Sequence, residues 1–304
     1  KNSILKKFKN SNVERISLAL SAGVDSTLVL AFLKKTLPDL EIDAISIKFA
    51  DSVDETKTAE KIAKNFGVNH HVLFVENYLR ELPKAISITK LPFWDLHWYY
   101  VAKKSKTFSN YLAAGDGGDE VFGGYTFRYA KFLSLINSKS SVLEKTQAYL
   151  KCHERDSVKD QESIFGEKIS FNWNFIYEQI SSNFDNNLSS LDQVFLADYN
   201  GKLMNNFSPI NNKINNYFEL TSITPLLSSE LISYATTLDS NQKYSDTKNI
   251  GKLPLQQLLK KYNLDSLILK EKQGFSVNTL NLWKSHGYEI CKNYLSDARI
   301  VEDK

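Results

Sequence analysis

Two short polar segments of the chain combine small residues with carboxylate and hydroxyl side chains. SAGVDST, residues 21–27, follows the apolar run RISLAL, and GDGGDE, residues 115–120, follows NYLAA. A loop of small residues lets the backbone approach a ligand closely, and the N–H groups at the start of a helix attract phosphate. A carboxylate in such a loop repels phosphate unless a divalent cation lies between them. The two segments therefore indicate a site for a phosphorylated ligand together with Mg²⁺.

The first segment alone is open to two interpretations. In one, Asp25 or Ser26 caps an ordinary strand-to-helix turn. In the other, Ser21, Ser26 and Thr27 donate to phosphate oxygens, and Asp25 is a Mg²⁺ ligand. The segment is neither GxGxxG nor a Walker A sequence, so it does not support the common nucleotide folds.

The second segment favours the ligand-binding interpretation. Asp116, Asp119 and Glu120 bring three acids into five residues, which costs free energy when no cation is near. We expect Asp119 to be the second Mg²⁺ ligand. Neither Asp25 nor Asp119 is expected to lie in the buried core.

Strands and helices alternate in the first 125 residues. We predict strands at 15–20, 41–49, 70–76 and 110–115, helices at 25–36 and 54–66, and a helical stretch broken near Pro92. This alternation predicts an α/β fold with a parallel sheet and helices on both faces. Ligands of such folds bind at the carboxyl ends of the strands, where both polar segments lie.

Residues 131–304 have a mainly helical pattern. Long helices are predicted at 129–156 and 253–272, and the Asn- and Ser-rich segments NFDNNLSS and NNKINN are predicted to be loops. The aromatic run WDLHWYY, residues 94–100, is expected in the core. We expect one domain over 1–304, with a nucleotide-binding α/β part at 1–130 and a mainly helical part at 131–304.

Composition excludes several classes of protein. The 304 residues carry a net charge of +3 without long runs of one sign, which favours no nucleic-acid partner. The two cysteines are isolated, and no run of 18 apolar residues occurs, so neither a disulfide framework nor a membrane span is expected. We expect a cytoplasmic protein.

Three segments resemble a known family. SAGVDS resembles the SGGxDS loop of the PP-loop ATP pyrophosphatases, and AAGDGGDEVFGGY is similar to SGEGSDExFGGY of the asparagine synthetases and their β-lactam synthetase relatives. KEKQGFSVNTLNLW, residues 270–283, is similar to the KQGFxVPxxxW segment of that family. The three motifs occur in the family's order and span nearly the whole chain. The resemblance implies the fold of the PP-loop ATP pyrophosphatases, which is adenine nucleotide α-hydrolase-like.

The resemblance also implies how ATP binds. Adenine would lie against Leu20 and Ile47, and the loop from Ser21 to Ser26 would hold the phosphates that leave as pyrophosphate. The nucleotide-binding residues expected on this basis are Leu20, Ser21, Ala22, Gly23, Val24, Asp25, Ser26, Ile47 and Gly115.

The implied reaction activates a carboxylate with ATP. Asp25 and Asp119 would bind Mg²⁺, and Lys272 matches a family lysine that reaches the α-phosphate. Asp116 takes the place of a glutamate that faces the acid substrate. The acid, with aspartate as the first candidate, would form an acyl-adenylate and release pyrophosphate, and ammonia would then displace AMP to give the amide, asparagine.

Four departures from the family pattern concern mostly the acid substrate. Ala22 replaces a glycine, which would be strained if the site needs a positive φ, and Asp116 replaces a glutamate. SITPLLSSEL, residues 222–231, stands where the family has ExRxPFLDxxL, which leaves Thr221, Ile223 and Ser228 in place of Glu, Arg and Asp. Asn212 stands where an aspartate is usual. Alternatives therefore stay open: a ligase for another carboxylic acid, a nucleotide-binding protein without catalysis, or an enzyme acting on tRNA.

The source of ammonia is a separate question. Family asparagine synthetases usually carry an N-terminal glutaminase domain that begins with a cysteine, and no such domain is expected in this chain. Ammonia would come from solution, from a glutaminase partner subunit or from a domain that has been removed. A homodimer is also left open.

Overall fold

The computed structural model describes residues 4, 8, 13–49, 54–91, 93, 95–153, 161, 170–268 and 279–296. They belong to two compact units. Unit 1 comprises Lys1–Gly117, Ser208–Ser233 and Pro254–Lys292, and unit 2 comprises Gly118–Phe207, Tyr234–Leu253 and Asn293–Lys304. The chain thus passes between the units several times. Within the described residues, no helix has the length and apolarity needed to cross a membrane.

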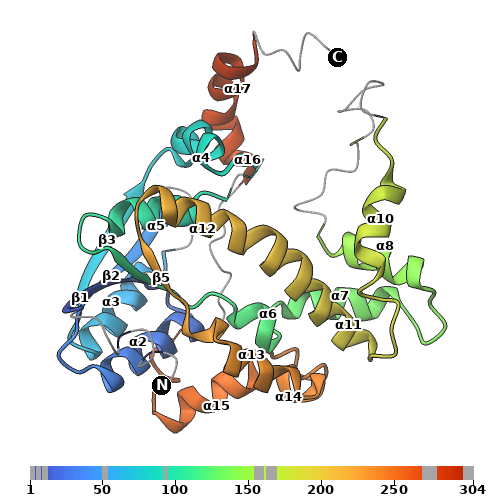
Figure 1. The fold of residues 1–304 in the computed structure, drawn as a ribbon, viewed down its shortest axis with the longest axis horizontal. Coiled ribbons are helices and arrows are strands. Elements are labelled where there is room, and N and C mark those ends of the chain that lie inside the picture. Colours follow the sequence, from blue (N-terminus) through green and yellow to red (C-terminus); the bar gives the residue numbers. More distant parts are fainter. Residues whose placement is uncertain are drawn as a thin grey trace. The chain divides into compact units, whose positions relative to one another are not determined.

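Unit 1 is built on a parallel sheet (Figure 1). Its five strands are β1 (Arg15–Ala19), β2 (Glu41–Phe49), β3 (Asn69–Val75), β4 (Tyr111–Ala113) and β5 (Thr221–Ile223). They are arranged in the order β3-β2-β1-β4-β5, and every pairing is parallel. The predicted α/β class and its four strands are confirmed. The fifth strand was not predicted.

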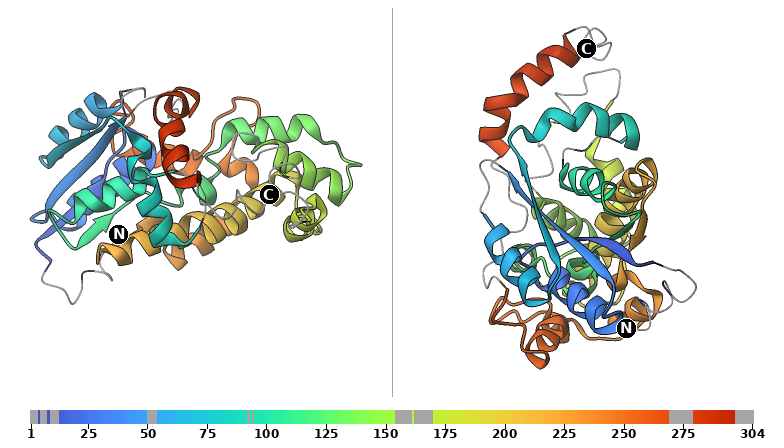
Figure 2. Two further views of the ribbon diagram at one scale, coloured as in Figure 1. Left: turned by 90° about the horizontal axis from the view of Figure 1, so that it is seen from above. Right: turned by 90° about the vertical axis from the view of Figure 1, so that its left-hand side faces the viewer.

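Helices cover both faces of this sheet. α2 (Val24–Thr36) connects β1 to β2, and α3 (Thr56–Asn65) connects β2 to β3. The chain then reverses direction across the sheet, and α5 (His97–Ser105) leads to β4. Right-handed crossovers place α2 and α3 on one face and α5 on the other. Figure 2, left, shows the light blue α3 and the teal α5 on opposite sides of the blue strands.

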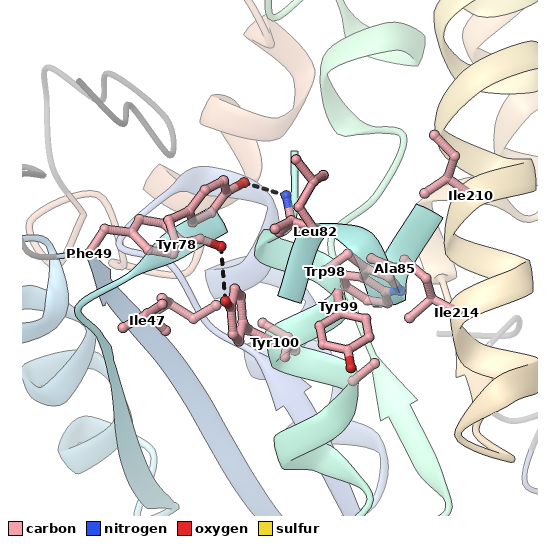
Figure 3. Close-up of a cluster of buried hydrophobic side chains, with 14 of the residues drawn as sticks. Ile47, Phe49, Tyr78, Leu82, Ala85, Trp98, Tyr99, Tyr100, Ile210 and Ile214 are labelled. Atoms are coloured by element: carbon pink, nitrogen blue, oxygen red, sulfur yellow. Dashed lines mark hydrogen bonds between the residues drawn. The ribbon is translucent and has the colours of Figure 1, made fainter. Parts of the chain in front are cut away.

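One hydrophobic core of unit 1 lies between the sheet and the helices of the α5 face. Trp98 and Tyr100 are buried there, as predicted for the aromatic run. Tyr78 is buried beside them, and its carbonyl oxygen accepts from the Tyr100 hydroxyl at 2.9 Å (Figure 3). Trp94 lies outside the described residues. The opposite wall comes from Ile210 and Ile214.

Both isoleucines belong to α12 (Ser208–Tyr217), so the prediction of a loop at NNKINN is wrong. Ile210 and Ile214 are four residues apart and therefore share one helical face, which is buried against the core. Asn215 accepts a hydrogen bond from Trp98 Nε1 at 2.9 Å. Burial of this face outweighs the weak helix propensity of asparagine.

Unit 2 is helical, with its own aromatic core of Tyr129, Phe132, Phe184, Phe195 and Tyr244. The helix predicted over 129–156 is divided into α7 (Thr126–Leu135) and α8 (Val142–Lys151). Ser141 ends the break, because its hydroxyl accepts from Glu144 N at 3.3 Å while Glu144 accepts from Ser141 N at 2.7 Å. This capping box starts a new helix and explains why one long helix does not form.

The helix predicted from residue 253 is also shorter. α15 spans Leu253–Lys261. Asn263 follows it with φ 55°, and the next residue, Leu264, donates its N–H to the carbonyl oxygen of Leu259 at 2.9 Å. A left-handed asparagine with this hydrogen bond is a common helix end, so the pattern of apolar residues continued further than the helix does.

The remaining helices complete the two units. They are η1 (Tyr78–Glu81), α4 (Leu82–Thr89), α6 (Gly118–Phe122), α10 (Trp173–Ser181), α11 (Ser190–Ala197), η2 (Asp198–Phe207), η3 (Pro225–Leu227), α13 (Ser229–Thr236), α14 (Ser240–Lys243), α16 (Thr279–Leu282), η4 (Trp283–Gly287) and α17 (Tyr288–Leu295).

Candidate active site

The loop between β1 and α2 is held by its own hydroxyl groups. Ser26 Oγ donates to the carbonyl oxygen of Ser21 at 2.9 Å and accepts from Ser21 N at 3.2 Å. Ser21 Oγ accepts from Gly23 N at 3.3 Å, and Thr27 Oγ1 donates to the carbonyl oxygen of Gly23 at 2.7 Å. The loop therefore has a defined shape before any ligand binds, which reduces the entropy lost on binding.

The alanine of this loop is not strained in the way that its replacement of glycine suggested. Ala22 is fully buried and does not have a positive φ. Gly23, the residue before α2, is extended, with φ −94° and ψ 169°. Val24 is the first residue of the helix. The backbone at Ala22 thus accepts a Cβ atom without the left-handed conformation that would require glycine.

The two residues expected to contact adenine are both buried and lie on neighbouring strands. Leu20 follows β1, and its backbone bonds to β2, where its N–H donates to Ile45 O at 2.9 Å and its carbonyl accepts from Ser46 Oγ at 2.7 Å. Ile47 packs at the margin of the core cluster. Their contact with a nucleotide stays a prediction.

The second polar loop packs directly on the first. β4 pairs with β1 in parallel, and Leu18 lies opposite Ala113. The loops that follow these two strands therefore begin at the same edge of the sheet. A Cβ atom on Gly115 would lie 2.7 Å from Asp25 Cβ and 2.8 Å from Ser26 N, closer than packed atoms come. Only glycine allows this approach. Asp25 is 8% exposed as a result, so the expectation that it lies outside the buried core is wrong.

Asp116 lies beside two polar residues of unit 1 that the sequence did not single out. Its Oδ2 accepts a hydrogen bond from Asn211 Nδ2, in α12, at 3.3 Å. Burial raises the pKa of the Asp116 carboxyl, and the charge of His97 and this hydrogen bond oppose the rise. His97 begins α5 and pairs through Nδ1 with Asp95 Oδ1 at 2.5 Å.

The altered residues between 221 and 231 lie in β5, in the turn after it and at the start of α13. Ile223, one of the residues that depart from the family pattern, is buried in β5, while Thr221 is exposed. Ser228 precedes α13 and accepts from Ile232 N at 2.9 Å through its carbonyl oxygen. Leu227 covers Gly117, because a Cβ atom there would lie 2.1 Å from Leu227 Cδ2. The substrate-side sequence changes therefore lie on one edge of the sheet and the turn after it.

Asp119 belongs to unit 2 and has a cationic partner there. Its Oδ1 lies 2.7 Å from Lys252 Nζ. The adjacent Glu120 is buried and accepts a hydrogen bond from the Tyr125 hydroxyl. Burial, followed by the charge of Asp119, raises the pKa of Glu120 to about 7. The two acids thus have different environments: Glu120 is buried beside a tyrosine, and Asp119 forms an ion pair with Lys252.

The predicted Mg²⁺ ligands are compatible with that ion in their chemistry. Carboxylate oxygens are what Mg²⁺ prefers, and Asp119 already holds an ammonium group. In the part of the chain that the structure describes, no group of three or more His, Cys, Asp or Glu side chains is placed to hold a metal. Since Asp25 belongs to unit 1 and Asp119 to unit 2, their joint ligation stays a prediction.

Lys272 lies outside the described residues, as does the whole of the KEKQGF motif around it. The same holds for Pro92. The assignment of Lys272 to the α-phosphate therefore rests on the sequence and stays a prediction.

The fold and the two packed loops define a class of protein: an α/β protein of the PP-loop type, with its polar loops at the carboxyl ends of parallel strands. The chain belongs to the asparagine synthase family, whose family model matches residues 11–304.

Two relatives match part of the chain. The chain is 31% identical to a glutamine-hydrolysing asparagine synthetase of Bacillus subtilis, named number 1, over 121 residues, which are 38% of this chain and 19% of the relative. It is 32% identical over 139 residues to a protein of Methanocaldococcus jannaschii that is named as a putative glutamine-hydrolysing asparagine synthetase, number 2. That match covers 40% of this chain and 27% of the relative. The chain thus matches well under a third of each relative's length.

Proposed function

We propose that this chain is an ATP-dependent amide ligase that adenylates a carboxylic acid, releases pyrophosphate and transfers the acyl group to ammonia. One observation carries most of the proposal. Gly115 brings the acidic loop against Asp25 and Ser26, at the carboxyl ends of β1 and β4. A hydroxyl-rich loop at the start of a helix suits a pyrophosphate leaving group, and the second loop supplies an acid next to it.

The chemistry explains why ATP is needed. A carboxylate resists nucleophilic attack because attack adds negative charge to an anion. A carboxylate oxygen of the substrate instead attacks the α-phosphorus of ATP, and the bond to the β-phosphate oxygen breaks. Ammonia then attacks the acyl carbon, the bond to AMP breaks, and the ammonium nitrogen loses a proton. Lys272 would stabilise the negative charge that develops on the α-phosphate, and Mg²⁺, when bound, neutralises phosphate charge.

Asp116 is the proposed substrate-facing acid. Its hydrogen bond with Asn211 fixes one carboxylate oxygen, and its raised pKa brings it closer to neutral pH than an exposed aspartate. Such a group suits contact with the ammonium group of an amino acid or with the attacking ammonia. Aspartate is the first candidate substrate, giving asparagine, and the changes at Thr221, Ile223 and Ser228 favour another carboxylic acid as the alternative.

The ammonia source follows from the relatives. Both are named as glutamine-hydrolysing, so a glutaminase domain or a partner subunit is proposed to supply ammonia to this chain. Ammonium salts should replace that source in the test tube.

The products of ATP turnover test the adenylation step. With aspartate, ATP, Mg²⁺ and ammonium chloride, we expect AMP and pyrophosphate in equal amounts, together with asparagine. A panel of carboxylic acids, assayed in the same way by chromatography, identifies the substrate if aspartate gives none. ADP and phosphate as the main products would contradict the proposal.

The metal assignment is tested by replacing each aspartate with asparagine. Asp25→Asn and Asp119→Asn should each weaken binding of Mg·ATP by about tenfold or more, because one anionic ligand is lost. Calorimetric titration measures this, and thermal unfolding checks the fold, since Asp25 is buried. Exposed Asp39 and Asp185 provide matched Asp→Asn controls. Parent-like affinity in both site variants would remove Asp25 and Asp119 from the metal site.

A further inference from the structure

Lys252 is held against Asp119 by an unusual local backbone. The lysine has φ 54°, a conformation that residues with a Cβ atom rarely adopt. Its N–H donates to the carbonyl oxygen of Phe122 at 3.0 Å, which ties it to the end of α6. Its side chain is 12% exposed, and Nζ lies 2.7 Å from Asp119 Oδ1. This lysine is therefore fixed, whereas most lysines extend into solvent.

Two glycines make room for this ion pair. A Cβ atom on Gly124 would lie 1.9 Å from Asp119 Oδ1 and 2.3 Å from Lys252 Cε. One on Gly251 would lie 2.0 Å from the carbonyl oxygen of Gly123. Gly124 N also donates to the carbonyl oxygen of Asp119 at 2.8 Å. The segments 119–124 and 251–252 thus fit each other only because these positions lack side chains.

The neighbouring acid has a hydrogen-bond partner of its own. Glu120 accepts from the Tyr125 hydroxyl, and the ring of Tyr125 has Lys202 Nζ 4.1 Å from its centre. Lys252 is accordingly matched to Asp119, the residue that the proposed function assigns to Mg²⁺.

We propose that Lys252 is a positioning residue and counter-cation for Asp119 in the nucleotide-free protein, and that a divalent cation must displace it to reach this carboxylate. That Asp119 binds a metal rests on the proposed function, whereas the competition by Lys252 rests on the observed ion pair. The lysine charge repels a divalent cation at short range and occupies the oxygen that the cation would use. The protein should consequently bind a divalent cation weakly on its own, and the cation should arrive together with ATP.

The test measures Mn²⁺ binding without nucleotide. Mn²⁺ serves as the probe because the electron paramagnetic resonance signal of the aqueous ion falls when it binds. Lys252→Met should lower the Kd for Mn²⁺ by about tenfold, since a positive charge within a few ångströms is removed. Lys252→Gln should do the same, which separates the loss of charge from the loss of a hydrogen-bond donor. Adding Asp119→Asn to Lys252→Met should abolish the gain.

A matched control uses another lysine in an ion pair. Lys103 Nζ lies 2.9 Å from Glu81 Oε1 in unit 1, and Lys103→Met should leave Mn²⁺ binding unchanged. Thermal unfolding of each variant checks its fold. If the Lys252 variants do not fold, Gly124→Ala tests the same idea with both charges retained. Its Cβ atom should force the pair apart and tighten Mn²⁺ binding.

Two results would overturn the inference, and they differ from failure of the proposed function. Parent-like Mn²⁺ affinity in the folded Lys252 variants would show that the ion pair is purely structural. The same conclusion would follow if the tighter Mn²⁺ binding of Lys252→Met persisted after Asp119→Asn was added. The metal assignment itself fails only if Asp119→Asn leaves Mg·ATP binding intact. A tenfold gain that depends on Asp119 supports the counter-cation function.

Discussion

Gly115→Ala is expected to lower the affinity for ATP by roughly tenfold to a hundredfold and the free energy of unfolding by about 1–3 kcal/mol, the usual cost of overpacking. The added Cβ atom would lie 2.7 Å from Asp25 Cβ, 2.8 Å from Ser26 N and 2.9 Å from Asp25 C. Most of these atoms belong to the backbone and cannot turn away as a long side chain does. Either the end of β4 or the segment that holds Asp25 and Ser26 must therefore move.

Calorimetry with ATP measures the first effect, and thermal unfolding measures the second. Gly201→Ala is the matched control, because a Cβ atom there meets nothing within 4 Å. It should leave ATP binding unchanged. A Gly115→Ala variant with parent-like affinity and stability would show that the two polar loops do not pack as described, and the main support for the nucleotide site would be lost.

Lys272→Ala is expected to reduce turnover by roughly a hundredfold or more, the scale seen when one preorganised charge-stabilising group is removed. The charge that Lys272 is proposed to stabilise would develop on the α-phosphate during attack, so its contribution would be larger in the transition state than with ATP bound. Affinity for ATP should change far less. Lys272→Arg should restore little, since a planar guanidinium does not place its charge where a compact ammonium group does.

AMP release at saturating ATP and acid substrate measures turnover, and calorimetry measures nucleotide affinity. Lys270→Ala, two residues earlier in the same motif, is the matched control and should retain turnover. Near-parent turnover in Lys272→Ala would show that this residue is an ordinary surface lysine without a catalytic function. Equal losses of binding and turnover would make it a phosphate anchor and not a catalytic group.

The fold of unit 1 was largely predictable because its signals are local. Each of the first four strands is a short apolar run, and the polar segments follow directly in sequence. The fifth strand gave no such signal, since Thr221–Ile223 has three residues and Pro225 follows closely. α12 was not predicted, because its many asparagines indicated a loop. Only the burial of its two isoleucines, Ile210 and Ile214, explains the helix.

The polar neighbours of the site were not predictable, because they come from distant parts of the chain. Asn211 follows Asp116 by 95 positions, and the two meet only when α12 lies beside the segment that follows β4. Lys252 is a similar case. It forms an ion pair with Asp119 and has a left-handed backbone, a conformation that lysine rarely adopts and that the sequence therefore does not predict. Composition and periodicity describe single elements and do not report which elements become neighbours.

The late position of β5 affects how the protein is made. Ala113 of β4 pairs with Ile223, which is synthesised 110 positions later. The ribosome therefore completes the intervening segment Gly118–Phe207 of unit 2 before the last strand of the sheet exists. Until then, one edge of β4 exposes unpaired backbone groups, which is a known hazard for aggregation of nascent chains. A translational pause between residues 114 and 220 would prolong that exposure.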